Sequence, residues 1–152
     1  MTTTNLKQGL YRQCQVFVDN RLQAIQKTID EIQISLTSET KSSAGDKHET
    51  GRAMLQIERE KAGQQLAEIQ KLNQILSKID LSQTSNNIGL GSIVLTSNAN
   101  YFITISAGEL KVDNQKFYAI SANTPIGQLL LGKQKGDQIT FRDYEFEIIS
   151  II

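Results

Sequence analysis

The chain has 152 residues, of which 39% are apolar and 21% are charged, a composition typical of one soluble domain or two small ones. Its 16 Lys and Arg residues balance 16 Asp and Glu residues, and it has no run of about 18 apolar residues, so we expect neither a strongly basic nucleic-acid-binding protein nor a membrane partner. The single cysteine, Cys14, excludes an internal disulfide and a zinc site of the usual kind, and the lack of a secretory signal at the start leads us to expect a cytoplasmic location.

The first 80 residues have the apolar pattern of two long helices. Apolar residues recur there at spacings of three and four, which is typical of a coiled-coil seam, and no proline interrupts them. The seam residues are Val18, Leu22, Ile25, Ile29, Ile32 and Leu36 in the first arm, and Leu55, Ala62, Leu66, Ile69, Leu72, Leu76 and Ile79 in the second. We expect two helical arms of roughly 30 to 35 residues each.

A polar segment, residues 37–45, separates the two arms. Small polar residues cluster in it, and such clusters favour a turn. Because the break lies midway between seams of similar length, we expect a monomeric, antiparallel hairpin. A dimer of one continuous helix stays open as the alternative, since a heptad seam does not by itself specify its partner or its direction.

The second half has the short apolar runs of a β-sheet. After a polar stretch over residues 82–87, runs of β-branched and aromatic residues occur at 93–95, 101–105, 117–120, 139–141 and 144–149, with turn residues between them. We expect a small antiparallel sheet. Its aromatic residues are expected to fill the core, and they are Tyr101, Phe102, Phe117, Tyr118, Phe141, Tyr144 and Phe146.

One short helix is predicted within the strands. Thr124 is suited to the N-cap, and Pro125 suits the first helical position, where a missing N–H costs nothing. Residues 126–131 supply an apolar face, and Gly132 ends the helix. The sheet is expected to wrap around this helix.

Residues 121–139 carry a recognisable motif. They read Ser-Ala-Asn-Thr-Pro-Ile-Gly-Gln-Leu-Leu-Leu-Gly-Lys-Gln-Lys-Gly-Asp-Gln-Ile. This run resembles the C-terminal signature of the Gre transcript-cleavage factors of bacterial RNA polymerase, in which Ser-Pro-Leu-Gly precedes Leu-Leu-Gly-Lys and Gly-Asp. Residues 91–94, Gly-Ser-Ile-Val, resemble the Gly-Ser-x-Val that opens the same domain.

The resemblance implies an α+β protein of two domains. An N-terminal antiparallel coiled-coil hairpin would occupy residues 1–80, a linker 81–90, and a C-terminal FKBP-like antiparallel β-sheet with one short helix 91–152. Active prolyl isomerases of the FKBP type have a tryptophan at the base of their pocket, and this chain has no tryptophan. We therefore do not expect isomerase activity.

The predicted hairpin turn extends the resemblance. Family members carry Gly-Asp-x-x-Glu at the tip, and residues 45–49 read Gly-Asp-Lys-His-Glu. The resemblance implies that Asp46 and Glu49 are the catalytic and metal-binding residues, which help hold Mg²⁺ in the active centre of the polymerase. Carboxylate oxygens suit this ion, and a second metal stabilises both the attacking and the leaving oxygen in phosphodiester hydrolysis.

Asp46 and Glu49 also fit a purely structural role. Asp-x-x-Glu is a capping box, worth about 1 kcal/mol of helix stability, and one pair of residues can serve both purposes. The tip also departs from the family pattern, which continues Glu-Asn-Ala-acid-Tyr. Here Arg52 stands where an acid is expected and Ala53 where the family has an aromatic residue.

Together, these features predict a transcription elongation factor of the GreA and GreB type. It would bind bacterial RNA polymerase, reach the 3′ end of the nascent RNA indirectly, and stimulate transcript cleavage by the polymerase without being an enzyme alone. Two alternatives stay open. One is a Gre-like regulator that enters the secondary channel and inhibits or modulates polymerase without cleavage, and the other is a coiled-coil adaptor unrelated to transcription.

Overall fold

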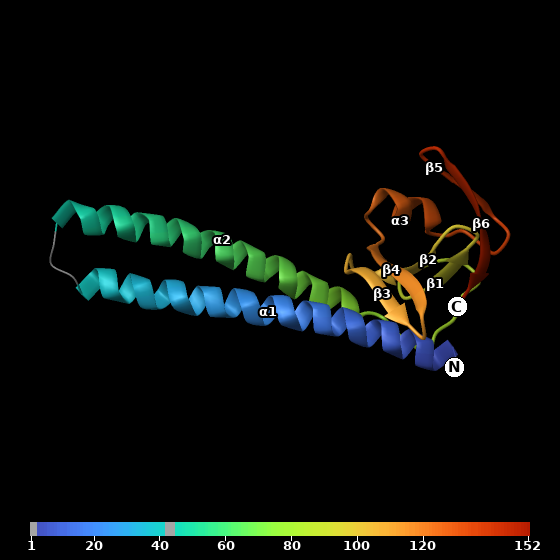
Figure 1. Cartoon of the computed structure of the whole chain (residues 1–152), viewed down its shortest axis with the longest axis horizontal. Helices are drawn as coiled ribbons and strands as arrows, with labels where there is room; N and C mark the ends of the chain where they lie inside the picture. The colour runs from blue at the N-terminus through green and yellow to red at the C-terminus, as the bar shows by residue number, and fades with distance from the viewer. Residues whose placement is uncertain (1–2, 42–44) are drawn as a thin grey trace. The chain divides into compact units, whose positions relative to one another are not determined.

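The computed structural model describes residues 3–41 and 45–152, with side chains described for 5–38 and 50–152. Two long helices come first, α1 (Thr3–Lys41) and α2 (Gly45–Ser77) (Figure 1). The remaining elements are β1 (Ile93–Thr96), β2 (Asn100–Thr104), β3 (Gly108–Val112), β4 (Gln115–Ser121), α3 (Pro125–Leu130), β5 (Gln138–Phe141) and β6 (Tyr144–Ile151). The predicted fold class, a helical hairpin and an antiparallel sheet with one short helix, is confirmed, except that one pair of strands, β2 and β4, is parallel.

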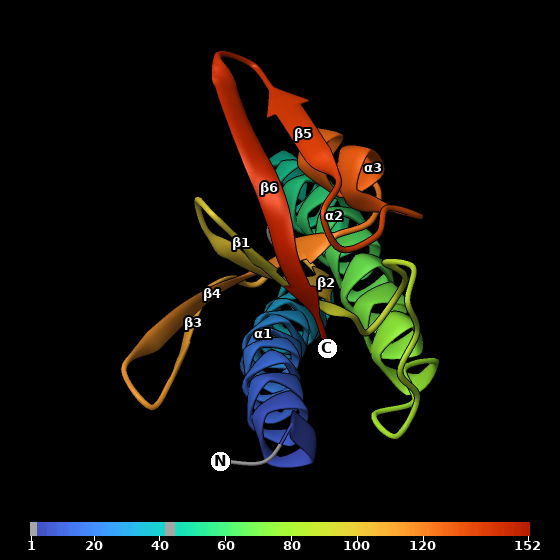
Figure 2. The same ribbon diagram turned by 90° about the vertical axis from the view of Figure 1, so that its right-hand side faces the viewer.

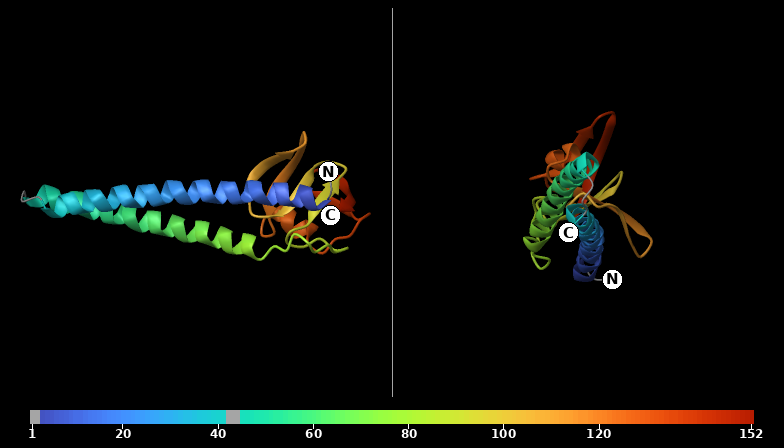
Figure 3. Two further views of the ribbon diagram at one scale, coloured as in Figure 1. Left: turned by 90° about the horizontal axis from the view of Figure 1, so that it is seen from below. Right: turned by 90° about the vertical axis from the view of Figure 1, so that its left-hand side faces the viewer.

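The two long helices bury the predicted heptad seam. Over residues 18–73 they run antiparallel (Figure 3). The seam residues that are buried here are Val18, Ile25, Ile29, Ile32, Ala62 and Ile69, and those that are half-buried are Leu22, Leu36, Leu55, Leu66 and Leu72. Because α1 ends at Lys41 and α2 returns beside it, the hairpin prediction is confirmed and the single continuous helix is excluded.

The break between the helices is shorter than the sequence suggested. A turn was expected over residues 37–45, but α1 continues through Thr37 to Lys41. Thr37 donates its hydroxyl to the carbonyl oxygen of Gln33 at 3.0 Å, one turn earlier. This bond gives the Thr37 hydroxyl a partner inside the helix. The small polar residues of the segment therefore do not end α1 at Thr37.

The sheet has six strands in the order β3-β4-β2-β1-β6-β5 (Figure 2). Its neighbouring strands are antiparallel except for β2 and β4, which pair in parallel with Tyr101 opposite Tyr118. Strand β3 was not predicted. It is an edge strand whose only buried residue is Leu110, so it lacks the apolar alternation that marks a strand in the sequence.

Both faces of the sheet are buried, each by a different helix. On one face Val94, Ile103 and Ile148 pack with Leu130 of α3, which lies beside β5 (Figure 2). Side chains alternate along a strand, so the other face carries Ile93, Phe102, Thr104, Phe117 and Leu110, all buried.

The first turns of α1 cover this second face. The amide group of Gln13 donates to the carbonyl oxygen of Lys111 at 2.8 Å and accepts from the Lys111 amide at 3.3 Å, which satisfies the outer edge of β3. Cys14 lies against Thr104, and a Cβ at Gly9 would contact Val112 at 3.6 Å. Residues of α1 therefore complete the core of the β-sheet.

The chain forms two compact units with a different division from the expected domains. One unit holds residues 18–73, and the other holds 1–17 together with 74–152. The expected linker, residues 81–90, belongs to the second unit. Ile88 is buried, its amide donates to Lys133 O at 2.9 Å, and its carbonyl accepts from Gly132 N at 2.8 Å. Whether residues 1–80 and 91–152 fold as separate domains stays a prediction.

The predicted short helix is present with its predicted ends. Thr124 is the N-cap of α3, and its Oγ1 accepts from Gly127 N at 3.1 Å; Pro125 follows at the first helical position. Gly132, with φ of 79°, comes directly after the C-cap, Leu131. A Cβ on Gly127 would lie 2.3 Å from the carbonyl oxygen of Ser121, so only glycine fits there.

Replacement of this glycine provides a test of the packing. We expect Gly127→Ala to lower the free energy of unfolding by about 3 kcal/mol, because a methyl group meets backbone that cannot move without breaking the cap. Gly89→Ala is the matched control, since a Cβ there has nothing within 4 Å, and its change should stay within about 0.5 kcal/mol. Urea unfolding of both variants makes the comparison; equal stabilities would contradict the close approach.

Candidate functional site

The predicted site lies at the turn of the helical hairpin. The backbone places Asp46 and Glu49 in the first turn of α2, which begins at Gly45. Residues three apart on a helix lie on the same side of it, and the N-terminal turn favours carboxylates because its amide groups are unpaired. The side chains of both residues lie outside the described part of the chain, so their metal-binding role stays a prediction.

The described residues nearest the turn include exposed apolar side chains. Ile34 on α1 is 67% exposed, and Met54 and Ile57 on α2 are 61% and 54% exposed. Over the residues with described side chains, no group of three or more His, Cys, Asp or Glu side chains could hold a metal ion. Within the same residues, no helix is long and apolar enough to cross a membrane.

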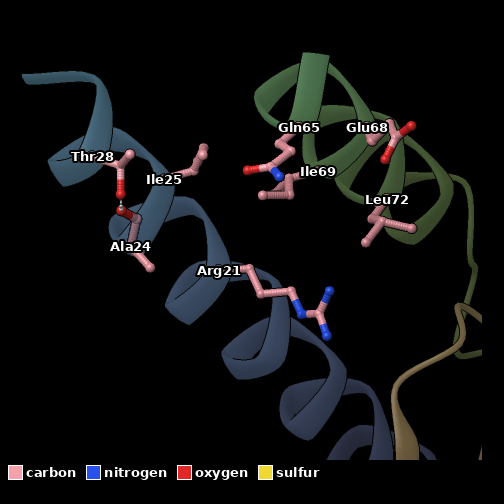
Figure 4. A pocket seen from close by; sticks show the side chains of 8 residues that line it. All are labelled: Arg21, Ala24, Ile25, Thr28, Gln65, Glu68, Ile69 and Leu72. Atoms are coloured by element: carbon pink, nitrogen blue, oxygen red, sulfur yellow. Dashed lines mark hydrogen bonds between the residues drawn. The ribbon is translucent and has the colours of Figure 1, made fainter. Parts of the chain in front are cut away.

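A groove of about 580 Å³ lies between α1 and α2 (Figure 4). Ile25 and Ile69, both nearly buried, line it from opposite helices. Arg21 and Glu68 are the charged residues among the described ones that line it, and the Thr28 hydroxyl donates to Ala24 O at 3.1 Å. Among the described residues, its lining holds neither a nucleophile with an adjacent base nor a set of metal ligands.

The glycines and the aspartate of the C-terminal motif shape the backbone. Gly132 and Gly136 have φ of 79° and 91°, a region that favours glycine. Asp137 Oδ2 accepts from Gln134 N at 2.8 Å, and the backbone of Gly136 and Asp137 bonds to both polar groups of Ile148 at 2.8 and 3.0 Å. The motif therefore sets the turn that leads from α3 into β5, a role that its sequence alone did not reveal.

The aromatic residues are less uniformly buried than predicted. Tyr101, Phe102, Phe117 and Phe146 are in the core as expected. The expectation is wrong for Tyr144, which is 63% exposed, and for Tyr118, which is 38% exposed. Tyr144 lies directly after the two-residue turn between β5 and β6, opposite Phe141 at the end of the hairpin. Burial raises the pKa of the Tyr101 phenol.

One charged residue of α1 was missed by the sequence analysis. Lys7 is 2% exposed, and its Nζ donates to Gln83 O at 3.0 Å. The pKa of Lys7 is lowered by burial, and the negative charge of Asp80 opposes this. The spacing of Lys7, Leu10 and Cys14 places all three on one stripe of the helix, which was the available signal.

The only cysteine is not a nucleophile. Cys14 is fully buried, as predicted. Burial raises the pKa of its thiol to about 11, and the neighbouring Thr104 hydroxyl acts in the opposite direction. A thiol with this pKa is protonated near neutral pH, so it cannot attack a substrate.

No family model and no curated protein matches this chain. Among solved structures it is similar to the GreA factor homolog 1 (Gfh1) protein of Thermus thermophilus, at 21% identity and a TM-score of 0.35, over 89% of this chain and 92% of that one. A second structure of the transcription factor Gfh1 has 21% identity and a TM-score of 0.34, over 88% and 90%.

The buried thiol predicts a specific dependence of stability on pH. Because folding raises the pKa of Cys14 from its ordinary value of 9.0 to about 11, the contribution of the thiol to stability is complete below pH 9.0 and is lost as the pH rises through 11. The stability difference between the wild type and Cys14→Ala should shrink over this window in denaturant titrations. The same difference at every pH would contradict the burial of an un-ionised thiol.

Proposed function

We propose that this protein is a Gre-like elongation factor that binds bacterial RNA polymerase. Its hairpin turn enters the secondary channel, where Asp46 and Glu49 help hold Mg²⁺ and stimulate cleavage of backtracked RNA by the polymerase. The observation that carries the proposal is the Gly-Asp-x-x-Glu motif at the start of α2, at the turn of a helical hairpin, in a chain that also carries the motif of residues 121–139. The two features resemble the same family independently.

The chemistry assigned to the turn follows from its residue types. Mg²⁺ prefers near-octahedral oxygen coordination and keeps several waters, so one or two carboxylates suffice when another molecule supplies the remaining ligands. A second metal ion in a phosphodiester-cleaving site stabilises the attacking water and the leaving oxygen together. Asp46 and Glu49 would supply the carboxylates, and the polymerase would supply the substrate and the other ligands.

The same reasoning makes the isolated protein inactive as a nuclease. Two carboxylates on a helical turn provide neither a complete ligand set nor a pocket that excludes water. Cleavage then requires the polymerase and its own active centre, with this protein as an accessory factor. The cytoplasm of a bacterium is the location that such a partner implies.

A second candidate function is inhibition of polymerase through the same channel. It is favoured by Arg52, which puts a positive charge three residues after Glu49 where the family has an acid, and by Ala53, which replaces an aromatic residue. Such a tip would occupy the channel without completing a metal site. A coiled-coil adaptor with no link to transcription is the third outcome of the tests below.

Binding to polymerase is the first prediction of the proposal. Purified protein should be retained by immobilised bacterial RNA polymerase, and Asp46→Asn should be retained equally, because the motif of residues 121–139 lies outside the tip. Lack of retention for both proteins would rule out the elongation factor and the inhibitor together, leaving the adaptor.

Cleavage of RNA in a backtracked complex is the second prediction. Asp46→Asn and Glu49→Gln should each abolish stimulated cleavage while thermal stability changes little, because Asn and Gln can make the same capping bonds as Asp and Glu. Glu58→Gln, an exposed carboxylate further along α2, is the matched control and should cleave as the wild type does.

The outcomes separate the roles of the two residues. If Asn and Gln are tolerated while Asp46→Ala lowers the free energy of unfolding by about 1 kcal/mol, the pair is a capping box and not a metal ligand. If the wild type binds polymerase but stimulates no cleavage at any Mg²⁺ concentration, the inhibitor is the correct function.

A further inference from the structure

The buried ammonium group of Lys7 is incompletely satisfied. Lys7 is 2% exposed, and its one hydrogen bond is the 3.0 Å bond to Gln83 O. Asp80 attracts it electrostatically, and the Oδ1 atom of Asp80 accepts from the amide and the hydroxyl of Ser82 at 2.9 and 2.6 Å. An ammonium group has three donors, so among the described residues two donors of Lys7 have no hydrogen-bond partner.

Lys7 is one of the residues that line a small polar pocket, which we call the Lys7 pocket. It has a volume of about 250 Å³ and lies within the unit formed by residues 1–17 and 74–152. Lys78 is a second cation in its lining, against one carboxylate, Asp80. Thr84 and Ser85 add hydroxyl groups, which can donate to a ligand. The pocket therefore offers a positive charge and several donors.

The free donors of Lys7 call for acceptors. Taking a charged group out of water is costly unless it is paired and hydrogen-bonded, and one carbonyl oxygen satisfies only a third of this ammonium group. The lowered pKa of Lys7 has the same cause, because burial disfavours the charged form. A negatively charged ligand with several oxygen atoms would both pair the charge and accept the remaining hydrogen bonds.

We propose that the Lys7 pocket binds a small oxyanion of the phosphate type, held by the ammonium groups of Lys7 and Lys78 and by the neighbouring hydroxyl groups. The pocket volume of about 250 Å³ is below the roughly 300 to 1,000 Å³ of pockets for drug-sized ligands, and it leaves room for a phosphate group. The phosphate is either free or the terminal group of a nucleotide. This site is separate from the hairpin turn and does not depend on the proposed function.

Thermal unfolding of the full-length protein tests the site. Inorganic phosphate at a saturating millimolar concentration should raise the melting temperature by roughly 3 °C over sodium chloride of equal ionic strength. Lys7→Met should abolish this shift, since it keeps the shape of the side chain and removes the charge. Lys71→Met, an exposed lysine of α2 outside the pocket, is the matched control and should keep the shift.

The source of the phosphate is distinguished by a second ligand. If ADP raises the melting temperature at a concentration tenfold lower than phosphate needs, the ligand is a nucleotide. If ADP and phosphate need equal concentrations, the ligand is the free anion. Both results support the site. A phosphate shift that Lys7→Met retains, or no phosphate shift in the wild type, overturns the proposal and leaves the pocket to solvent. Phosphorus NMR line broadening by the wild type gives the same answer if Lys7→Met unfolds.

Discussion

The fold depends on a sheet whose two faces must both be kept from water. One face of the sheet is covered by α3. The opposite face, which carries Phe102 and Phe117, is also buried, so another element must cover it. The first turns of α1 supply the cover, with Leu10 and Cys14 in the buried stripe and Gln13 bonded to the edge strand at Lys111. Residues at the start of the chain and residues near its end thus share one core, which explains why the compact units do not follow the change of sequence pattern near residue 80.

The C-terminal motif and the hairpin turn have different physical roles. The motif consists largely of positions that the backbone dictates, such as Gly127, where a Cβ would collide with Ser121 O, and Gly132, which needs a positive φ. The resemblance of this motif to a family is therefore evidence for the fold before it is evidence for an activity. The hairpin turn carries the Gly-Asp-x-x-Glu motif but departs from the family pattern at Arg52 and Ala53. Its chemical role belongs to the proposed function.

The first turn of a helix can serve structure and chemistry at once. Carboxylates at Asp46 and Glu49 are favoured by the unpaired amide groups of that turn and by the helix dipole. The same oxygens can bind a cation when a partner brings one close, because a capping carboxylate keeps lone pairs free. In the proposed function, the active centre of the polymerase would supply the other ligands of the Mg²⁺ ion. Only an experiment with the polymerase can therefore assign the function.

The sequence by itself determined the local features of this protein. The heptad period gave the helical hairpin, five of the six strands followed from β-branched and aromatic runs, and Thr124, Pro125 and Gly132 marked both ends of α3, because each of these signals acts over a few neighbouring residues. Only the tertiary structure decided what depends on distant partners: the parallel pairing of β2 with β4, the edge strand β3, the exposure of Tyr144 and the burial of Lys7 against Gln83. The bond of Lys7 to Gln83, for example, joins residues 76 positions apart in the chain, and no local pattern encodes such a contact.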